Sequence, residues 1–554
     1  MIDALVLRAG RTPGTGPQRI PVTPVTVIVG PNNAGKSRLL MELTQLCVQG
    51  DSNPNPRFVV DSIEYEKLSR QEAERRVDAL RKEPIDRPTL PAEYAYIGRY
   101  NQLHQVHREA LIQMVMDPTR SRNNDFHQAY LGNKLLNLDG GSRINLAGSQ
   151  AMGDLSRHPE TPFGQLLVDD AKRCAFRKIV YDAFGEYVVL DPTAGGNVRL
   201  RFSQVEPPAS VDRSFSDEAI GFFRAAAPIE LRSDGVKAFV GVVLQLIAGD
   251  PSILLIDEPE AFLHPALAFK LGVQIATLAE GKRVFAATHS PDFLMGCIVA
   301  GAPVTIIRVT YRNGQATARV LPNDELLCLM RNPLLRSTGV LAGLFYEGVV
   351  VTEGDSDRAF YQEINERLRL FNPNTTIPNC LFLNAQNKQT VHSLIRPLRT
   401  LGIPAAGIVD IDMLKEAGGN WKNFLEGGFV PEIDRQSLSQ GRALVEQRFN
   451  QSGVNMKNGG LAQLSKTDRE AALNIVERLS EYGLFIVSRG EVEAWLPGLG
   501  VSGPKERWLS RIFEKLGSDP SDAGYVKPKD DDVWQFLASV AAWIKDVNRK
   551  GIPD

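Results

Sequence analysis

The chain has 554 residues, a formal net charge of −2, 43% hydrophobic residues and 23% charged residues. The length exceeds that of a single ordinary domain, and the composition is typical of a folded chain rather than a disordered one. The balanced charge argues against a protein that coats nucleic acid over its whole surface, although a local basic groove is compatible with it.

The cysteine pattern argues against a zinc site and against a disulfide framework, because the chain has no CxxC pair and no Cys/His cluster. Its cysteines are scattered: Cys47, Cys174, Cys297, Cys328 and Cys380. Free cysteines of this kind are typical of a reducing cytoplasm. The N-terminal stretch has no signal-peptide core, and no apolar run is long enough to span a bilayer. We therefore expect a cytoplasmic protein without membrane contact.

Strand-like and helix-like segments alternate along the chain, which predicts an α/β fold. The clearest strands are expected at Val25–Val29, Ile253–Ile256, Val284–Ala287, Val349–Thr352 and Gly407–Val409. Each of these strands ends in glycine or polar residues. Ligands of open α/β sheets bind at the carboxyl ends of the strands, so this edge is where we expect chemistry.

The first strand runs into the segment GPNNAGKS and then into a helix-like stretch at Lys36–Val48. This strand–turn–helix context is that of a P-loop, whose backbone N–H groups hold the phosphates of ATP. Lys36 is expected to reach the terminal phosphates, and Ser37 to ligate Mg²⁺. The predicted ATP-binding residues of this loop are Gly30, Asn32, Asn33, Gly35, Lys36 and Ser37.

The region 51–225 is interpreted as a large insertion that follows the P-loop helix. It contains a predicted β-hairpin, in which two strand-like runs flank the turn at 192–197. The polar segment Arg120–Asn124 is expected to be a loop.

Three further motifs fit an ATPase. Asp257 and Glu258 end an apolar strand, where the first would hold Mg²⁺ and the second would orient or deprotonate the attacking water. His289 follows the next strand and is expected to contact the γ-phosphate. Ser233 and Gly235 begin an apolar helix, an arrangement that can bind phosphate; its alternative reading is an ordinary N-cap.

Together these motifs resemble the ABC-type ATPase heads of DNA-repair and chromosome-maintenance proteins. The resemblance implies that two heads sandwich ATP, so that Ser233 of one copy meets the nucleotide of another in a homodimer or higher oligomer. The family also has a glutamine loop, for which Gln102, Gln105 and Gln150 are all candidates. The signature here lacks the second glycine and the glutamine of the LSGGQ form.

The second half of the chain carries carboxylates after three predicted strands, where their mutual repulsion calls for a divalent cation. We expect Mg²⁺ or Mn²⁺, which can clamp a phosphodiester for hydrolysis. Lys505 is a candidate for stabilising the reacting phosphate; its alternative is a solvated surface lysine. The predicted ligands are Glu353, Asp357, Asp410, Asp412, Ser488, Glu491 and Glu493.

The Glu353 motif and the Asp410/Asp412 pair resemble a TOPRIM fold. With the ATPase in front, the chain resembles the OLD (overcoming lysogenization defect) family of endonucleases, and Ser488, Gly490, Glu493 and a later lysine also fit that family. The expected architecture is an ABC-type ATPase domain over 1–335 and a TOPRIM domain over 340–554 with a helical insertion at about 413–480. The resemblance implies ATP and Mg²⁺ or Mn²⁺ as cofactors and a role in antiphage defence.

The leading hypothesis is a nuclease whose cutting is controlled by ATP, with catalytic residues Glu258, Glu353, Asp410, Asp412 and Lys505 and with DNA favoured over RNA. A second hypothesis is an ATP-driven DNA sensor or loader whose TOPRIM module binds without cutting. A topoisomerase is disfavoured, because it needs a nucleophilic tyrosine in a separate domain and this chain has no room for such a domain. A primase is disfavoured, because primases do not normally carry an ABC head. A second defence-system protein is a further candidate partner.

Overall fold

The computed structural model describes residues 1–52, 55–84, 87–99, 102–118, 126–156, 159, 161–312, 314–453, 455–503 and 505–553. The expected loop at Arg120–Asn124 lies outside these residues. The chain forms two compact units, and the boundary between them falls at Asn323 and Asp324. The expected domain bounds, 1–335 and 340–554, stay a prediction. No helix within the described residues is both long enough and apolar enough to cross a membrane.

The first unit is built on a six-stranded sheet in the order β16-β15-β3-β14-β13-β8. Its strands are β3 (Val25–Val29), β8 (Leu135–Leu138), β13 (Ile253–Asp257), β14 (Arg283–Ala287), β15 (Val304–Arg312) and β16 (Gln315–Leu321). β15, β3, β14, β13 and β8 run parallel, and β16 is antiparallel to β15. The predicted strands β3, β13 and β14 are confirmed.

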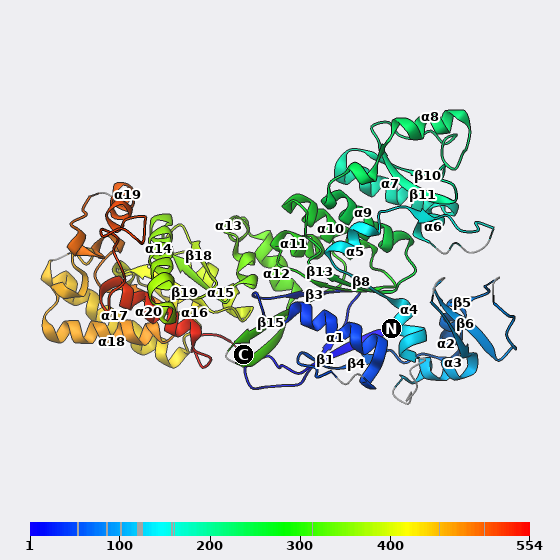
Figure 1. Ribbon diagram of the computed structural model, residues 1–554. Helices are drawn as coiled ribbons and strands as arrows, with labels where there is room; N and C mark the ends of the chain where they lie inside the picture. The colour runs from blue at the N-terminus through cyan, green and yellow to red at the C-terminus, as the bar shows by residue number, and fades with distance from the viewer. Residues whose placement is uncertain are drawn as a thin grey trace. The chain divides into compact units, whose positions relative to one another are not determined.

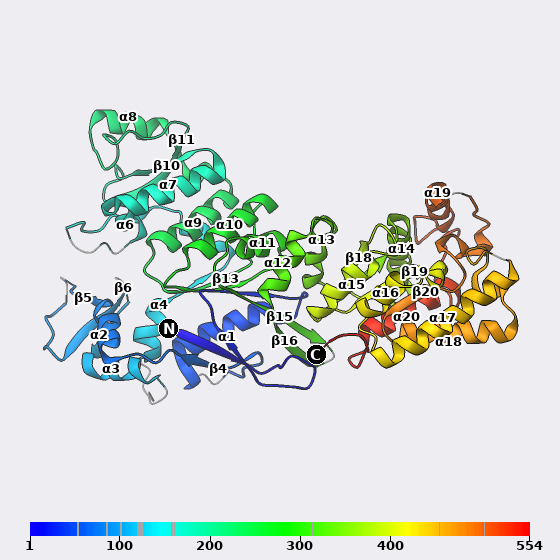
Figure 2. The ribbon, with the colours of Figure 1, turned by 180° about the vertical axis from the view of Figure 1, so that it is seen from behind.

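Helices cover both faces of this sheet. α1 (Lys36–Gln49) lies on one face, and α9 (Asp234–Ala248), α10 (Pro265–Leu278) and α11 (Pro291–Val299) lie on the other, as the two opposite views show (Figures 1 and 2). α9 is buried on nearly every side, which agrees with its almost continuous apolar sequence. The predicted helix at Lys36–Val48 is confirmed.

The region 51–225 is not one appended insertion, since two of its strands join the body of the unit. β4 (Val60–Tyr65) pairs with β1 (Ile2–Leu7), which also pairs with β2 (Gln18–Pro21). β8 pairs with β13 and forms the edge of the main sheet. The expected hairpin is confirmed, because β10 (Tyr187–Asp191) pairs with β11 (Asn197–Ser203).

The remaining elements of the first unit form two small sheets and several short helices. The strands are β5 (Arg81–Lys82), β6 (Tyr94–Arg99), β7 (Gln102–His107), β9 (Gln150–Ala151) and β12 (Ala227–Pro228). The helices are α2 (Arg70–Asp78), α3 (Arg108–Met116), α4 (Gly132–Lys134), α5 (Gly140–Asn145), α6 (Pro162–Val168), α7 (Asp170–Phe184) and α8 (Asp217–Ala225).

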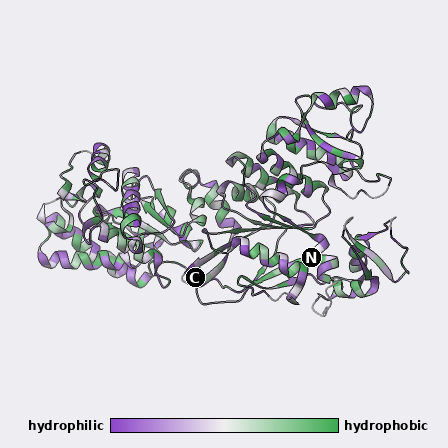
Figure 3. Ribbon diagram, in the orientation of Figure 1, coloured by the Kyte–Doolittle hydropathy of each residue, from purple (hydrophilic) through white to green (hydrophobic). Residues whose placement is uncertain are grey.

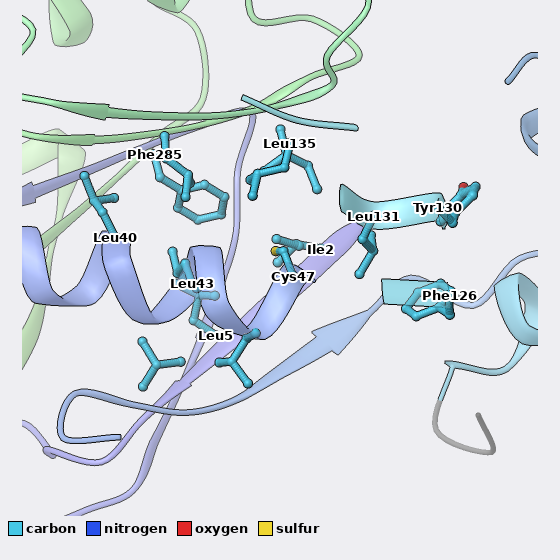
Figure 4. Packing of buried hydrophobic residues seen from close by; sticks show 14 of the residues in the cluster. Ile2, Leu5, Leu40, Leu43, Cys47, Phe126, Tyr130, Leu131, Leu135 and Phe285 are labelled. Carbon is cyan, nitrogen blue, oxygen red and sulfur yellow. The ribbon is translucent and has the colours of Figure 1, made fainter. Parts of the chain in front are cut away.

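The main core of this unit lies between α1 and the sheet. Leu40 and Leu43 of α1 face Phe285 of β14, and Ile2 and Leu5 close the core from β1 (Figure 4). These side chains are fully or almost fully buried. Burial of apolar surface stabilises the packing of the P-loop helix by roughly 25 cal/mol per Å², so α1 is held firmly behind the loop that precedes it.

The second unit is a parallel four-stranded sheet in the order β18-β17-β19-β20. Its strands are β17 (Gly348–Thr352), β18 (Cys380–Asn384), β19 (Ala405–Asp410) and β20 (Leu484–Val487). α15 (Val391–Thr400) packs on β17 and β19. α14 (Asp355–Phe371) packs on β17 and β18, α20 (Asp532–Lys545) packs on β19, and these two helices pack on each other. The predicted strands β17 and β19 are confirmed.

The expected insertion of the second unit is helical, as predicted. It contains α16 (Gly419–Gly427), α17 (Glu432–Ser452) and α18 (Lys466–Ser480) between β19 and β20. α17 and α18 pack on each other and alternate hydrophilic and hydrophobic residues, as expected of half-exposed helices (Figure 3). The other helices are α12 (Asn323–Arg331) and α13 (Pro333–Ser337) at the boundary and α19 (Lys505–Leu516).

Candidate ATP site and candidate carboxylate centre

The register of the first sheet brings its predicted motifs to one edge. Ile28 of β3 and Asp257 of β13 both lie opposite Ala287 of β14. The residues that follow these strands are the P-loop, Glu258 and the Thr288–His289 pair. Three of the predicted ATPase motifs therefore leave the sheet side by side.

Three residues of the P-loop have positive φ angles. Gly30, Asn33 and Gly35 have positive φ angles of 146°, 60° and 94°, and Gly35 is the N-cap of α1. Glycine and asparagine adopt such angles most readily, which explains these residue types here. An anion at this helix N-terminus is further favoured by the helix dipole.

Lys36 is buried at the start of α1, with only 5% of its surface exposed. Burial lowers the pKa of its ammonium to about 8, against the attraction of Asp257, Glu258 and Glu260. A cation held at such a cost is well suited to a phosphate, which would return the lost solvation as charge pairing.

Glu258 sits in a strained backbone position that two contacts stabilise. Its φ angle is 49°, and its N–H donates to the carbonyl of Ala287 at 2.8 Å. The Nη1 of Arg143 donates to the carbonyls of Asp257 and Glu258, at 2.9 and 2.8 Å. The Arg143 side chain, carried by α5 just after β8, is fully buried. It thus fixes the backbone of Asp257, the predicted Mg²⁺ ligand, and of Glu258, the predicted catalytic acid.

Glu260 links the end of β13 to the end of β14. Its carboxylate accepts from the N–H of His289 at 2.7 Å and from the hydroxyl of Thr288 at 2.8 Å. Burial raises the pKa of Glu260, and the hydrogen bond from His289 opposes that rise. Burial, followed by the charge of Lys36, lowers the pKa of the His289 imidazole. Glu260 therefore positions the loop that carries His289.

Sequence reasoning missed both positioning residues. Glu260 carries a weak signal in the sequence, as the third acid of Asp-Glu-Pro-Glu. Arg143 offered none, because its segment matches no motif and its neighbour β13 is distant in the chain.

Ser233 and Gly235, the two residues predicted to form the signature motif, have different surroundings. Ser233 is the N-cap of α9, and its exposed side chain makes no capping hydrogen bond. Gly235 is buried, and a Cβ added to it would lie 2.4 Å from the carbonyl oxygen of Phe262. The glycine is therefore required by the close approach of the turn after β13, whereas the serine hydroxyl faces outward.

The candidates for the glutamine loop lie on different elements of the first unit. Gln105 is exposed on β7, and the side chain of Gln102 lies outside the described residues. Gln150 lies on β9, where its amide donates to the carbonyl of Leu146 at 2.8 Å. The structure places none of the described candidates beside the P-loop strand, so the choice among them stays open.

In the second unit, Glu353 and Asp410 meet at the carboxyl edge of the sheet. Glu353 follows β17, Asp410 ends the neighbouring β19, and the Asp410 N–H donates to Oε1 of Glu353 at 2.7 Å. Burial, assisted by the charges of Asp412 and Asp357, raises the pKa of Glu353 to about 7, against this hydrogen bond. The two predicted residues thus lie next to each other, as expected of the carboxyl ends of adjacent parallel strands.

Asp357 has a local task in addition to its predicted one. Its Oδ2 accepts from the N–H of Gly354, the N-cap residue of α14, at 2.9 Å and so ties the first turn of the helix to the residue before it. The side chain is almost fully buried. Its assignment as a metal ligand remains a prediction.

Two lysines neutralise the carboxylates. Lys388 Nζ lies 2.9 Å from Asp412 Oδ2 and 3.0 Å from Glu416 Oε1. Lys457 Nζ lies 3.4 Å from Asp412, 3.4 Å from Glu491 and 3.9 Å from Asp410. Sequence reasoning missed both, since they come from loops whose place in the fold it did not assign.

The remaining predicted residues follow β20. Ser488 is the next residue after the strand, and its carbonyl accepts from the N–H of Leu461 at 2.9 Å. Glu493 lies in a short 3₁₀ turn two residues beyond Glu491. Lys505 begins α19, and its side chain lies outside what the structure describes.

The donor set suits a hard divalent cation, because carboxylate oxygens dominate and Asp412 Oδ1 is buried without a hydrogen-bond partner among the described residues. Nevertheless, no three described His, Cys, Asp or Glu side chains stand ready as a group to hold a metal ion. The centre fits Mg²⁺ or Mn²⁺ chemically, while in this structure lysine ammonium groups balance the negative charge.

Comparisons with known proteins agree with the prediction of an ATPase domain followed by a TOPRIM domain. Residues 183–295 match the family model "AAA domain, putative AbiEii toxin, Type IV TA system", and residues 344–412 match "Overcoming lysogenization defect protein-like, TOPRIM domain". The Old nuclease of Escherichia phage P2 is 23% identical over 305 residues, which cover 52% of this chain and 50% of that protein. The chain therefore spans about half the length of this curated relative.

Two solved structures are similar to the chain at a lower level. The "SmcHead bound to the C-winged helix domain of ScpA" is 15% identical, with a TM-score of 0.34, over 59% of this chain and 99% of that one. The "SMC head domain from Thermotoga maritima" is 12% identical, with a TM-score of 0.30, over 58% and 99%.

Proposed function

Since the chain combines an AAA-type ATPase domain with an OLD-like TOPRIM domain, we propose that it is an ATP-hydrolysing, divalent-metal-dependent endonuclease of the OLD family. The substrate is nucleic acid, with DNA favoured, and the biological role is antiphage defence. The observation that carries the proposal is the Glu353–Asp410 contact at the edge of the TOPRIM sheet. It holds the Glu353 carboxylate against the backbone of Asp410 on the neighbouring strand, at the edge where an open α/β sheet binds its ligand.

In the ATPase half, Lys36 binds the terminal phosphates and Ser37 and Asp257 hold the Mg²⁺ that accompanies ATP. Glu258 orients the attacking water, and Arg143 fixes its backbone. His289 contacts the γ-phosphate from the loop that Glu260 holds. Ser233, whose hydroxyl faces outward, contacts the nucleotide of a second copy of the chain, so the active ATPase is a homo-oligomer.

In the TOPRIM half, Glu353, Asp410, Asp412, Glu491 and Glu493 are the groups that would hold Mg²⁺ or Mn²⁺. When bound, such an ion supplies Lewis-acid polarisation of the phosphodiester. Glu353 fixes the end of β19 through the Asp410 N–H, so that the two carboxylates keep one geometry. Asp357 stabilises the first turn of α14 and thereby holds the Glu353 loop.

The test is a cleavage assay on supercoiled plasmid with Mg²⁺ or Mn²⁺, with and without ATP. Glu353→Gln should abolish cutting, whereas Asp355→Asn should leave it intact, because Asp355 is exposed and pairs only with Arg358 among the contacts described. Lys36→Ala shows whether nucleotide licenses or restrains the reaction. A Glu353→Gln variant that cuts as fast as the natural chain would remove the metal-centre assignment.

A second candidate function is an ATP-driven DNA sensor or loader that does not cut. The observation in its favour is that two lysine ammonium groups contact Asp412, Lys388 at 2.9 Å and Lys457 at 3.4 Å. The same assay separates the two functions when DNA binding is measured beside it. Binding without cleavage of plasmid or of a structured RNA favours the sensor, and cleavage of RNA alone makes the protein a ribonuclease.

A further inference from the structure

The helical insertion of the second unit returns to the sheet by packing its backbone directly on the loop after β20. The Leu461 N–H donates to the Ser488 carbonyl at 2.9 Å. A Cβ on Gly490 would lie 2.2 Å from the Lys457 carbonyl oxygen, and a Cβ on Gly460 would lie 2.1 Å from the Ser488 carbonyl oxygen. Both glycines also have positive φ angles. The backbone of Lys457 is therefore fixed against the carboxylate centre.

From this anchored backbone, the Lys457 side chain reaches three of the predicted metal-binding carboxylates. Its Nζ is 3.4 Å from Asp412 Oδ2, 3.4 Å from Glu491 Oε2 and 3.9 Å from Asp410 Oδ2. The ammonium group therefore lies among the three carboxylates and balances their negative charge.

Lys388 has a different set of partners from Lys457. It shares Asp412 with Lys457, but its second partner is Glu416, which belongs to the turn after β19 rather than to the predicted ligand set. Lys457, in contrast, forms its described ion pairs with predicted ligands alone. The two lysines are therefore not equivalent. A bound metal ion would compete with Lys457 for all of its carboxylate partners.

The metal ion and the Lys457 ammonium would compete for the same carboxylate oxygens. Carboxylates this close repel one another unless a cation lies among them, and a divalent ion and an ammonium use the same oxygen lone pairs. A lysine ammonium sits on a flexible four-carbon stem, so it can withdraw while its backbone stays in place.

We propose that Lys457 is the resident counter-ion of the metal-free centre, and that a divalent cation binds by displacing its ammonium from Asp410, Asp412 and Glu491. The inference rests on the proposed metal dependence. It gives the insertion a function, because the segment that follows α17 sets how tightly the centre holds metal. The metal-bound and metal-free states then differ in where the Lys457 side chain lies.

The test is calorimetric titration of Mn²⁺ into the full chain without nucleotide. Asp412→Asn identifies which part of the heat comes from this centre. Lys457→Met should lower the dissociation constant for that site by about tenfold or more, since the competing charge is gone. Lys457→Arg, which keeps the charge, and Lys466→Met, which removes an exposed lysine of the same insertion, should bind as the natural chain does.

Thermal unfolding gives an independent readout that does not need cleavage. Lys457→Met should lower the melting temperature without metal, because carboxylate repulsion is unbalanced, and Mn²⁺ should raise it by more than in the natural chain. Equal or weaker Mn²⁺ binding by Lys457→Met would overturn the displacement. If no variant gives an Asp412-dependent heat, the proposed metal dependence itself fails, and the displacement fails with it.

Discussion

Replacing Lys36 by methionine should stabilise the nucleotide-free ATPase unit while removing its response to ATP. The reason is that Lys36 is buried, and burial lowers the pKa of its ammonium from 10.5 to about 8 despite three nearby carboxylates. The folded state therefore disfavours the charged form, which the unfolded chain solvates freely. Methionine has a similar length and carries no charge, so it avoids this penalty.

The magnitude follows from the shift. Each pKa unit corresponds to about 1.4 kcal/mol, so a fall from 10.5 to about 8 gives an upper bound of about 3 kcal/mol. Water at the edge of the P-loop screens part of it, and we expect about 1–2 kcal/mol, or a rise of about 2–5 °C in melting temperature.

The pH dependence has a fixed sign, because the folded pKa lies below the unfolded one. The penalty in the natural chain is fully present below about pH 8 and fades between pH 8 and 10.5, as Lys36 loses its proton in the folded state. The advantage of Lys36→Met should therefore be greatest at pH 7 and should shrink across this window.

The assay is thermal unfolding at pH 7.5 and at the highest pH the protein tolerates, with and without ATP and Mg²⁺. Lys178→Met, which removes an exposed lysine of α7, serves as the control and should change little. A Lys36→Met protein that melts below the natural chain without nucleotide, or that ATP stabilises equally well, would refute the reasoning.

Two further predictions concern packing. Gly235→Ala should cost about 1–3 kcal/mol, because its Cβ would lie 2.4 Å from the Phe262 carbonyl, whereas Gly221→Ala, inside α8 with open space around it, should gain up to about 1 kcal/mol. Denaturant unfolding measures the change in the free energy of unfolding for both variants. Two changes of the same sign would contradict the clash at Gly235. Arg399→Leu should destabilise the TOPRIM unit by about 3–5 kcal/mol, because its buried guanidinium donates to the carbonyls of Ala405, Gly428, Tyr482, Gly483 and Gly551. The exposed Arg396→Leu on the same helix should have little effect, and a similar loss there would point to a general defect of α15.

The sequence by itself determined the strands and turns whose cause is local. A buried parallel strand is a run of apolar residues, and a phosphate loop needs glycine or asparagine at positive φ, so β3, β13, β14, β17 and β19 and the P-loop were predicted with nearly correct bounds. The pairing of Glu353 with Asp410 was also predictable, because the carboxyl ends of parallel strands share an edge.

Only the tertiary structure decided which residues support those motifs. Arg143 reaches Asp257 across more than a hundred residues of chain, and its helix follows β8, an edge strand inside a region that was expected to be an insertion. Lys457 reaches Asp412 from the loop between α17 and α18 of the helical insertion. Such contacts depend on which loops the packed sheet brings together, and long flexible side chains carry no periodicity or spacing that would report their partners. The catalytic motifs are local patterns, whereas the charges that balance them are set by the fold.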